Sequence, residues 1–125
     1  MERAAKAGLV TIHGTHRGVL HYGSVKPFDI ETLVTSARKT GAVVTVENQS
    51  IIGGLGGAVC ETLAEHWPVQ VRRLGIPDQV GEVATEQYLF DKHGFGPVHI
   101  ASACRELAGN ATEVRSKERM ESLIE

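Results

Sequence analysis

The pattern best suited to chemistry in this 125-residue chain is a run of glycines, Gly53-Gly54-Leu55-Gly56-Gly57. A glycine-rich turn before a helix can present backbone N–H groups and the positive end of the helix dipole to a phosphate. The run fails the dinucleotide-binding fingerprint, because Val59 stands where the pattern needs its third glycine or alanine. No lysine follows it as in a P-loop. Tight packing of the helix against a sheet or a neighbouring chain is therefore the favoured role, with phosphate binding as the alternative.

Arg72 and Arg73 are a second candidate, since two adjacent arginines are unusual in a segment that reads as a strand. Neighbouring residues on a strand face opposite sides of the sheet, so at most one of the two can point inward. That arginine is a candidate for binding an anion or an interface carboxylate. Surface charge at the end of a strand is the plainer interpretation.

Histidines and cysteines provide no stronger pattern. His13, His16 and His21 cluster in the sequence, but no cysteine or carboxylate lies close by, so loop histidines are favoured over a metal site. Cys60 and Cys104 fall in no known motif and are expected to be small buried side chains rather than a disulfide. We predict no catalytic residue and no metal site on this chain.

Composition excludes several classes of partner. Thirteen Lys and Arg against fifteen Asp and Glu give a net charge of −2, which disfavours nucleic acid. The first ten residues are too polar for a signal peptide, and no apolar stretch is long enough to cross a membrane. A cytoplasmic protein with no membrane partner is expected.

The chemistry-bearing residues must be positioned by alternating strands and helices. The first half is expected to hold a helix over Met1–Ala7, a hairpin of Leu9–His13 and Val19–Tyr22, a helix capped by Asp29 and ended by Gly41, and a strand over Ala42–Val46. A loop over Glu47–Ile52 follows, and then a helix that is opened by the glycine run and ended by Pro68. The second half is expected to hold a strand over Val69–Leu74, a turn over Gly75–Asp78, and helices over Thr85–His93 and from Pro97. This alternation predicts an α/β domain in three layers, with a mostly parallel sheet and helices on both faces. The domain is expected to span residues 1–109. Residues 110–125 form a charged tail, read as a marginal helix or a disordered end.

Three motifs in order resemble the C-terminal domain of transketolases. They lie in Val25–Asp29, in Val44–Val59, and in Val71–Asp78 followed by Gly81-Glu82, so that the resemblance covers roughly residues 19 to 108. Related domains occur in deoxyxylulose-phosphate synthases and in the β subunits of 2-oxoacid dehydrogenases. The sequence from Arg72 to Gly75, together with Gly81-Glu82, is more similar to transketolase than to either of those.

The resemblance implies an α/β domain with a five-stranded, largely parallel sheet. The family's domain usually opens with a strand that is absent here, so the sheet lacks a strand, Leu9–His13 replaces it, or a partner supplies it. The family's thiamine diphosphate, with a divalent metal, sits between a pyrophosphate domain and a pyrimidine domain, and neither fits in 125 residues. No cofactor is therefore expected on this chain. The family often has a histidine where Gln49 stands, near the active-site mouth.

The resulting hypothesis is a C-terminal section of a transketolase-type transferase that moves a two-carbon ketol unit between sugar phosphates, as in pentose phosphate metabolism. The chain's own role would be structural, within a homo-oligomer, either beside a separate catalytic polypeptide that carries the other two domains or as a fragment of a longer enzyme. A stand-alone small-ligand or nucleotide-binding module and a docking domain for a multienzyme complex are the alternatives. The candidate anion or interface residues are Gln49, Gly53, Gly54, Gly56, Gly57, Arg72 and Arg73.

Overall fold

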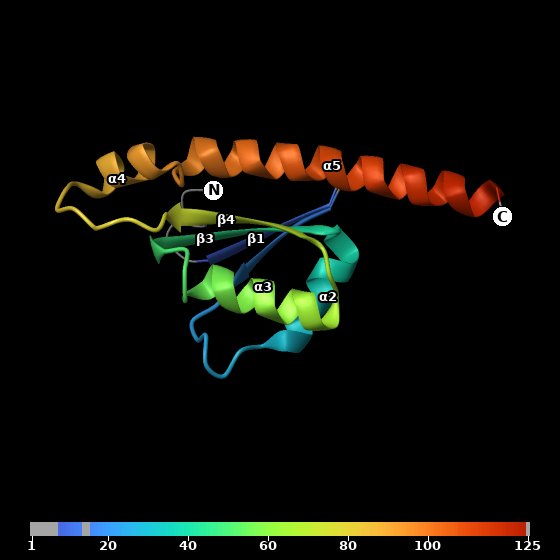
Figure 1. The fold of residues 1–125 in the computed structure, drawn as a ribbon, viewed down its shortest axis with the longest axis horizontal. Helices are drawn as coiled ribbons and strands as arrows, with labels where there is room; N and C mark the ends of the chain where they lie inside the picture. Colours follow the sequence, from blue (N-terminus) through green and yellow to red (C-terminus); the bar gives the residue numbers. More distant parts are fainter. Residues whose placement is uncertain (1–7, 14–15, 125) are drawn as a thin grey trace.

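A single mixed sheet organises the computed structural model, which describes residues 8–13 and 16–124. Its elements are β1 (Gly8–His13), β2 (His16–His21), α2 (Ile30–Thr40), β3 (Ala42–Ser50), α3 (Leu55–His66), β4 (Gln70–Ile76), α4 (Glu86–His93) and α5 (Pro97–Ile124). Helices α2 and α3 cover one face of the sheet and α5 covers the other (Figure 1). The expected α/β class with three layers is confirmed. The helix expected over Met1–Ala7 lies outside the described residues.

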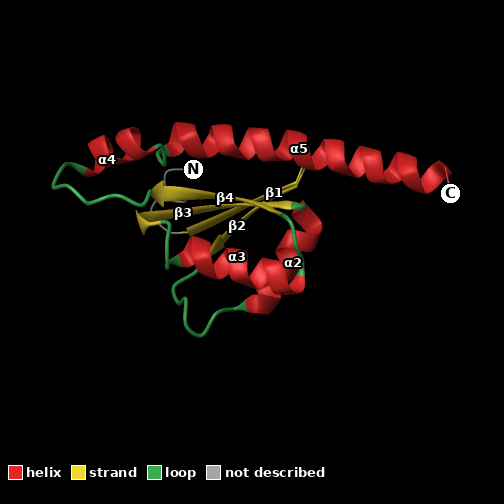
Figure 2. Ribbon diagram, viewed as in Figure 1, coloured by secondary structure: helices red, strands yellow, loops and turns green. Residues whose placement is uncertain are grey.

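The sheet differs from the expected one in strand direction. The described residues form four strands in the order β2-β1-β3-β4, one fewer than the family's five, in agreement with the absence of the opening strand (Figure 2). Only β3 and β4 pair in parallel, whereas β1 is antiparallel to both of its neighbours. The cause is the hairpin formed by β1 and β2. Because β1 inserts between β2 and β3, the crossover through α2 joins two strands that point the same way but are not adjacent. The strand over Leu9–His13 is thus present as part of β1.

Residues 42–47 of strand β3 are buried on both faces, as the largely apolar run Ala42–Val46 predicts. Ala42, Val44 and Val46 face α5, where they pack with side chains such as Ile100 and Leu107. Val43 faces α2 and α3, where it packs with Leu33, Ala37, Leu55, Val59 and Leu63. One strand therefore supplies both halves of the core.

Strands β3 and β4 are both longer than expected. Residues 47–50, expected in a loop, continue β3, and residues 75–76, expected in a turn, continue β4 until Ser50 pairs with Ile76. The register shifts between Val46 and Ser50, which marks a bulge in β3. A side chain at Gly75 would meet the backbone oxygens of Glu47 and Gln49 at 2.9 Å, so glycine allows the two backbones to approach there.

Residues expected to begin and end helices do so. Asp29 accepts a hydrogen bond from the backbone N–H of Thr32 at 3.0 Å, and this bond holds the pKa of Asp29 below its usual range. Gly41 and Gly94 end α2 and α4 with φ of 78° and 67°, in the left-handed region that favours glycine. Thr85 caps α4 by accepting from the N–H of Tyr88.

Helix α5 continues past Gly109 as one helix of 28 residues. Its first half packs on the sheet, and Leu107 is its last fully buried residue. Its second half extends beyond the sheet (Figure 1), where Val114, Met120, Leu123 and Ile124 are exposed. Packing energy therefore comes from only the first part of the helix.

Deleting residues 113–125 should change the free energy of unfolding by less than about 1 kcal/mol, because the described side chains removed are exposed. Leu107→Ala, which opens a cavity under the same helix, should lower it by about 2–5 kcal/mol. Urea unfolding monitored by circular dichroism measures both changes in the free energy of unfolding. A deletion as destabilising as Leu107→Ala would contradict the expected domain boundary near residue 109.

Candidate functional site

The glycine run opens α3, as expected, but its helix N-terminus already holds an anion. Gly54 is the N-cap residue, and it has no side chain that could accept hydrogen bonds from the free backbone N–H groups of the first turn. The carboxylate of Glu47, from β3, accepts these hydrogen bonds instead. Its Oε2 lies 2.9 Å from the nitrogen of Leu55, and its Oε1 lies 3.0 Å from the nitrogen of Gly56. Both hydrogen bonds are buried.

The Glu47 carboxylate fits this place for reasons of charge. A negative group is stabilised at a helix N-terminus by the helix dipole and by charge-assisted hydrogen bonds. The side chain of Gln49 donates a further hydrogen bond from Nε2 to Oε2 at 3.2 Å. Glu47 is only 7% exposed, so these donors replace the water that the carboxylate loses on burial. A phosphate could bind here only by displacing Glu47.

Three of the glycines are required by backbone conformation or by close contact. Gly53 has φ of +76°, which a side chain would strain. A Cβ on Gly54 would overlap the Glu47 carboxylate, and one on Gly56 would lie 2.9 Å from both Glu47 Oε1 and Arg73 Cδ. By contrast, a Cβ on Gly57 would meet no atom within 4 Å. The glycines thus make room for a carboxylate and an arginine stem from the same chain.

Arg72 and Arg73 point to opposite faces of the sheet, as strand geometry predicts. Arg72 donates to Glu106 of α5 at 2.8 Å, in a partly exposed ion pair. Arg73 lies on the α3 side, where its stem packs beside Gly56 and its Nη1 donates to the carbonyl oxygen of Ile51 at 2.9 Å. Their guanidinium groups therefore contact groups of this chain rather than forming one anion site.

The structure brings together Gln49, Gly54, Gly56 and Arg73 around Glu47, and leaves Arg72 on the other side of the sheet. Gly53 adjoins this group, and Gly57 has no contact there. Sequence reasoning missed Glu47 itself. One signal could have found it: α3 lacks a capping side chain, and Glu47 is the sole acidic residue between positions 41 and 60.

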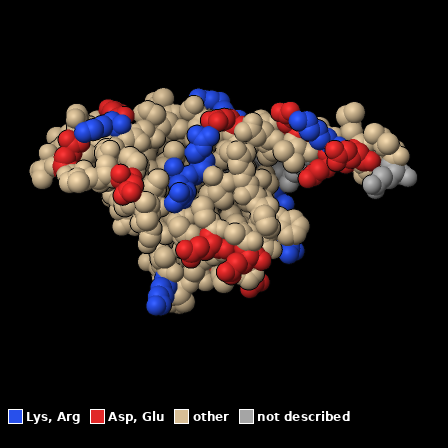
Figure 3. Space-filling view, viewed as in Figure 1, with Lys and Arg blue, Asp and Glu red and all other residues tan. Residues whose placement is uncertain are grey.

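The rest of the described chain offers no cluster of metal ligands. Within residues 8–13 and 16–124, no three His, Cys, Asp or Glu side chains gather where they could hold a metal ion. No helix in this part of the chain is long and apolar enough to cross a membrane. On the face seen in Figure 3, basic and acidic side chains form small groups of both signs rather than one broad basic surface. The arrangement around Glu47 can stabilise the β3–α3 junction, but it presents no free nucleophile or open anion site.

Alanine substitutions in the glycine run should separate packing from ligand binding. Gly54→Ala and Gly56→Ala should each lower the free energy of unfolding by about 1–3 kcal/mol, because the methyl group displaces a buried, hydrogen-bonded carboxylate. Gly57→Ala is the matched control and should be neutral or stabilising by up to about 1 kcal/mol, since alanine favours a helix more than glycine. Thermal and urea unfolding, with and without millimolar nucleotide or sugar phosphate, measures these effects. If wild-type protein gained stability from the phosphate compounds and Gly56→Ala lost only that gain, the packing interpretation would be wrong.

Removing the carboxylate should destabilise the fold and create an anion site. Glu47→Ala leaves two buried N–H groups without their acceptor, and each unsatisfied donor costs about 1–3 kcal/mol. Glu47→Gln keeps one acceptor oxygen and should lose less. Added formate should then raise the melting temperature of Glu47→Ala, but not that of the wild type, because it binds only the vacated helix N-terminus. Chloride at equal ionic strength is the control, and equal responses to both salts would refute the assignment.

Comparison with known proteins identifies the family. Residues 3–100 match the family model described as "Transketolase, C-terminal domain". The chain is 51% identical over 89 residues to the 6-deoxy-6-sulfo-D-fructose transketolase subunit SqwH of Clostridium sp. (strain MSTE9), which covers 71% of this chain and 28% of that protein. It is 38% identical over 104 residues to a subunit of the apulose-4-phosphate transketolase of Phocaeicola vulgatus, covering 82% of this chain and 33% of that protein.

A solved structure agrees with these sequence matches. The chain described as "Split gene transketolase, inactive beta4 tetramer" superposes with a TM-score of 0.61 and 46% sequence identity, over 67% of this chain and 27% of that chain. The present chain thus spans a third or less of these relatives. The family match covers most of the sequence and agrees with the fold, so the chain belongs to the transketolase family, of which it carries the C-terminal domain.

Proposed function

We propose that this chain is the C-terminal section of a transketolase-type enzyme that transfers a two-carbon ketol unit between sugar phosphates. Its own role is structural: it stabilises the assembly and shapes the entrance to an active site formed by other domains. Family membership supports the type of enzyme, and two relatives are named as transketolase subunits. The observation that carries the structural role is the Glu47 carboxylate at the N-terminus of α3, where it takes the place of a bound phosphate.

The proposal places thiamine diphosphate, the family's cofactor, outside this chain, and the contacts of the candidate anion residues support this. A diphosphate needs unpaired N–H groups or cations, and the candidate groups already have partners: Glu47 accepts the N–H groups at the start of α3, while Arg72 and Arg73 bind Glu106 and the Ile51 carbonyl. The cofactor's divalent metal would need a cluster of oxygen ligands, which the described part of the chain lacks. The proposal therefore assigns the cofactor to a partner polypeptide with the pyrophosphate and pyrimidine domains. No step of the reaction is assigned to this chain.

The same contacts argue against a stand-alone nucleotide-binding module. Such a module would place its phosphate at the start of α3, where Gly54 and Gly56 leave just enough room for the Glu47 carboxylate. The glycines that suggested phosphate binding therefore support an internal contact.

Titration calorimetry with thiamine diphosphate and Mg²⁺ should detect no saturable binding to the isolated chain. When the chain is co-expressed with the thiamine-diphosphate-binding polypeptide of the same organism, the two should co-purify. The mixture should transfer ketol units between sugar phosphates, whereas the chain alone should not. Micromolar cofactor binding by the chain alone would refute the proposal, and so would full activity of the catalytic polypeptide without it.

A further inference from the structure

The loop between β4 and α4, residues 77–85, exposes two apolar side chains that the domain does not use. Val80 is 95% exposed and Val83 is fully exposed. Every residue from Pro77 to Thr85 is exposed, so the loop adds no side chain to the core. A single exposed valine is ordinary on a protein surface. Two within four residues, on a loop that is held in place, call for an explanation.

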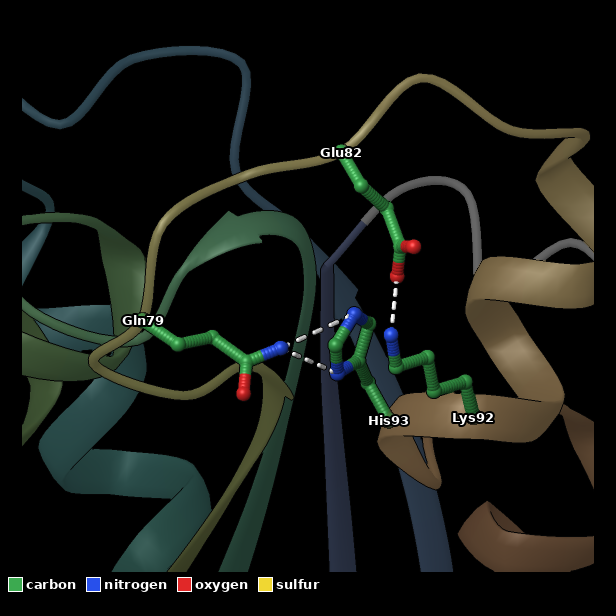
Figure 4. A network of polar contacts seen from close by, with 4 residues as sticks. All are labelled: Gln79, Glu82, Lys92 and His93. Carbon is green, nitrogen blue, oxygen red and sulfur yellow. Dashed lines mark hydrogen bonds and ion pairs between the residues drawn. The ribbon is translucent and has the colours of Figure 1, made fainter.

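Two polar contacts fix this loop to the last turn of α4 (Figure 4). The side-chain amide of Gln79 lies 3.2 Å from Nδ1 of His93, and Glu82 forms an ion pair with Lys92. The hydrogen bond from Lys92 to Glu82 also raises the pKa of Lys92. Within the loop, the N–H of Gln79 donates to the carbonyl oxygen of Pro77 at 2.8 Å. A loop held in this way loses less conformational entropy when a partner binds it.

The loop lies at the carboxyl ends of the parallel strands. Ser50 and Ile76 pair at the ends of β3 and β4, and the N–H of Ile51 donates to the Ile76 carbonyl oxygen at 3.0 Å. Ile52, which is 58% exposed, follows on the neighbouring loop. Figure 1 shows both loops leaving the same end of the sheet, opposite the C-terminus. Exposed apolar side chains from two separate segments therefore lie at one end of the molecule.

We infer that the β4–α4 loop, through Val80 and Val83, is a docking surface for the thiamine-diphosphate-binding part of a transketolase-type enzyme. This inference rests on the proposed function. About two thirds or more of the SqwH and apulose-4-phosphate relatives lies outside the region matched here, so in those proteins this domain is joined to a larger remainder. The family match over residues 3–100 also runs through this loop, whose residues are all exposed.

The chemistry of the loop favours a protein partner over an ionic ligand. Residues 77–85 contain no Lys or Arg, and the nearby Lys92 of α4 is paired with Glu82, so no unpaired cation is available for a phosphate at that point. The exposed valines instead gain free energy when an apolar surface removes them from water. The expected partner surface is therefore apolar at its centre, with polar groups around it.

The test compares two matched double variants of the intact chain. Val80→Asp with Val83→Asp places charges on the loop, and Leu123→Asp with Ile124→Asp makes the same kind of change on exposed residues at the far end of α5. Both should melt like the wild type, because none of the four side chains is buried. Calorimetry then measures binding to the thiamine-diphosphate-binding polypeptide of the same organism. The loop variant should bind at least about tenfold more weakly, and the α5 variant should bind like the wild type.

The outcomes distinguish the two proposals. If the wild type binds and the loop variant binds equally well, the docking surface is wrong while the proposed function stands. If the wild type does not bind the polypeptide at all, the proposed function fails and the inference fails with it. Sedimentation velocity of the chain alone tests a third outcome. If the loop variant loses only self-association and keeps its partner affinity, the loop contacts a second copy and the inference is refuted.

Discussion

The hydrogen bonds from the start of α3 to the Glu47 carboxylate determine how the β3–α3–β4 unit fits together. They fix the end of one strand to the beginning of the helix that leads to the next strand. The absence of side chains at Gly54 and Gly56 leaves space for the carboxylate, and Arg73 from β4 packs against the same opening. The backbone N–H groups of a helix N-terminus without a capping side chain thereby find their acceptor inside the protein. The surrounding glycines, the Gln49 amide and the Arg73 stem are all arranged around this one charge.

This arrangement shows why a glycine-rich turn before a helix is ambiguous in a sequence. Phosphate-binding loops and the present structure use the same physical property, which is a set of backbone N–H groups at the positive end of a helix dipole. The difference lies in where the negative charge comes from. Here it comes from Glu47, seven residues before the N-cap residue on the preceding strand. The glycines alone carry no information about that source.

Local sequence signals predicted most of the helices and strands, but they did not predict the contacts between segments that are distant in the sequence. Asp29, Gly41, Thr85 and Gly94 act within a few residues of themselves, and their helices begin and end as expected. The two-sided burial of β3 followed from its apolar sequence. The insertion of β1 between β2 and β3 could not be predicted in this way, because strand order depends on contacts between distant segments. The same holds for Glu47, whose partners lie eight and nine residues away, and for the extension of β4 through Gly75, which depends on a bulge in β3.

The length of α5 has a practical consequence for handling this protein. At a rise of 1.5 Å per residue, its 28 residues span about 42 Å, and its far end lies beyond the sheet, away from α4 (Figure 1). An affinity tag, a dye or a solid support attached at the far end of α5 would therefore lie at the opposite end of the molecule from the β4–α4 loop. Immobilisation through this end leaves the carboxyl edge of the sheet facing solution. The helix acts as a built-in spacer for surface-based measurements.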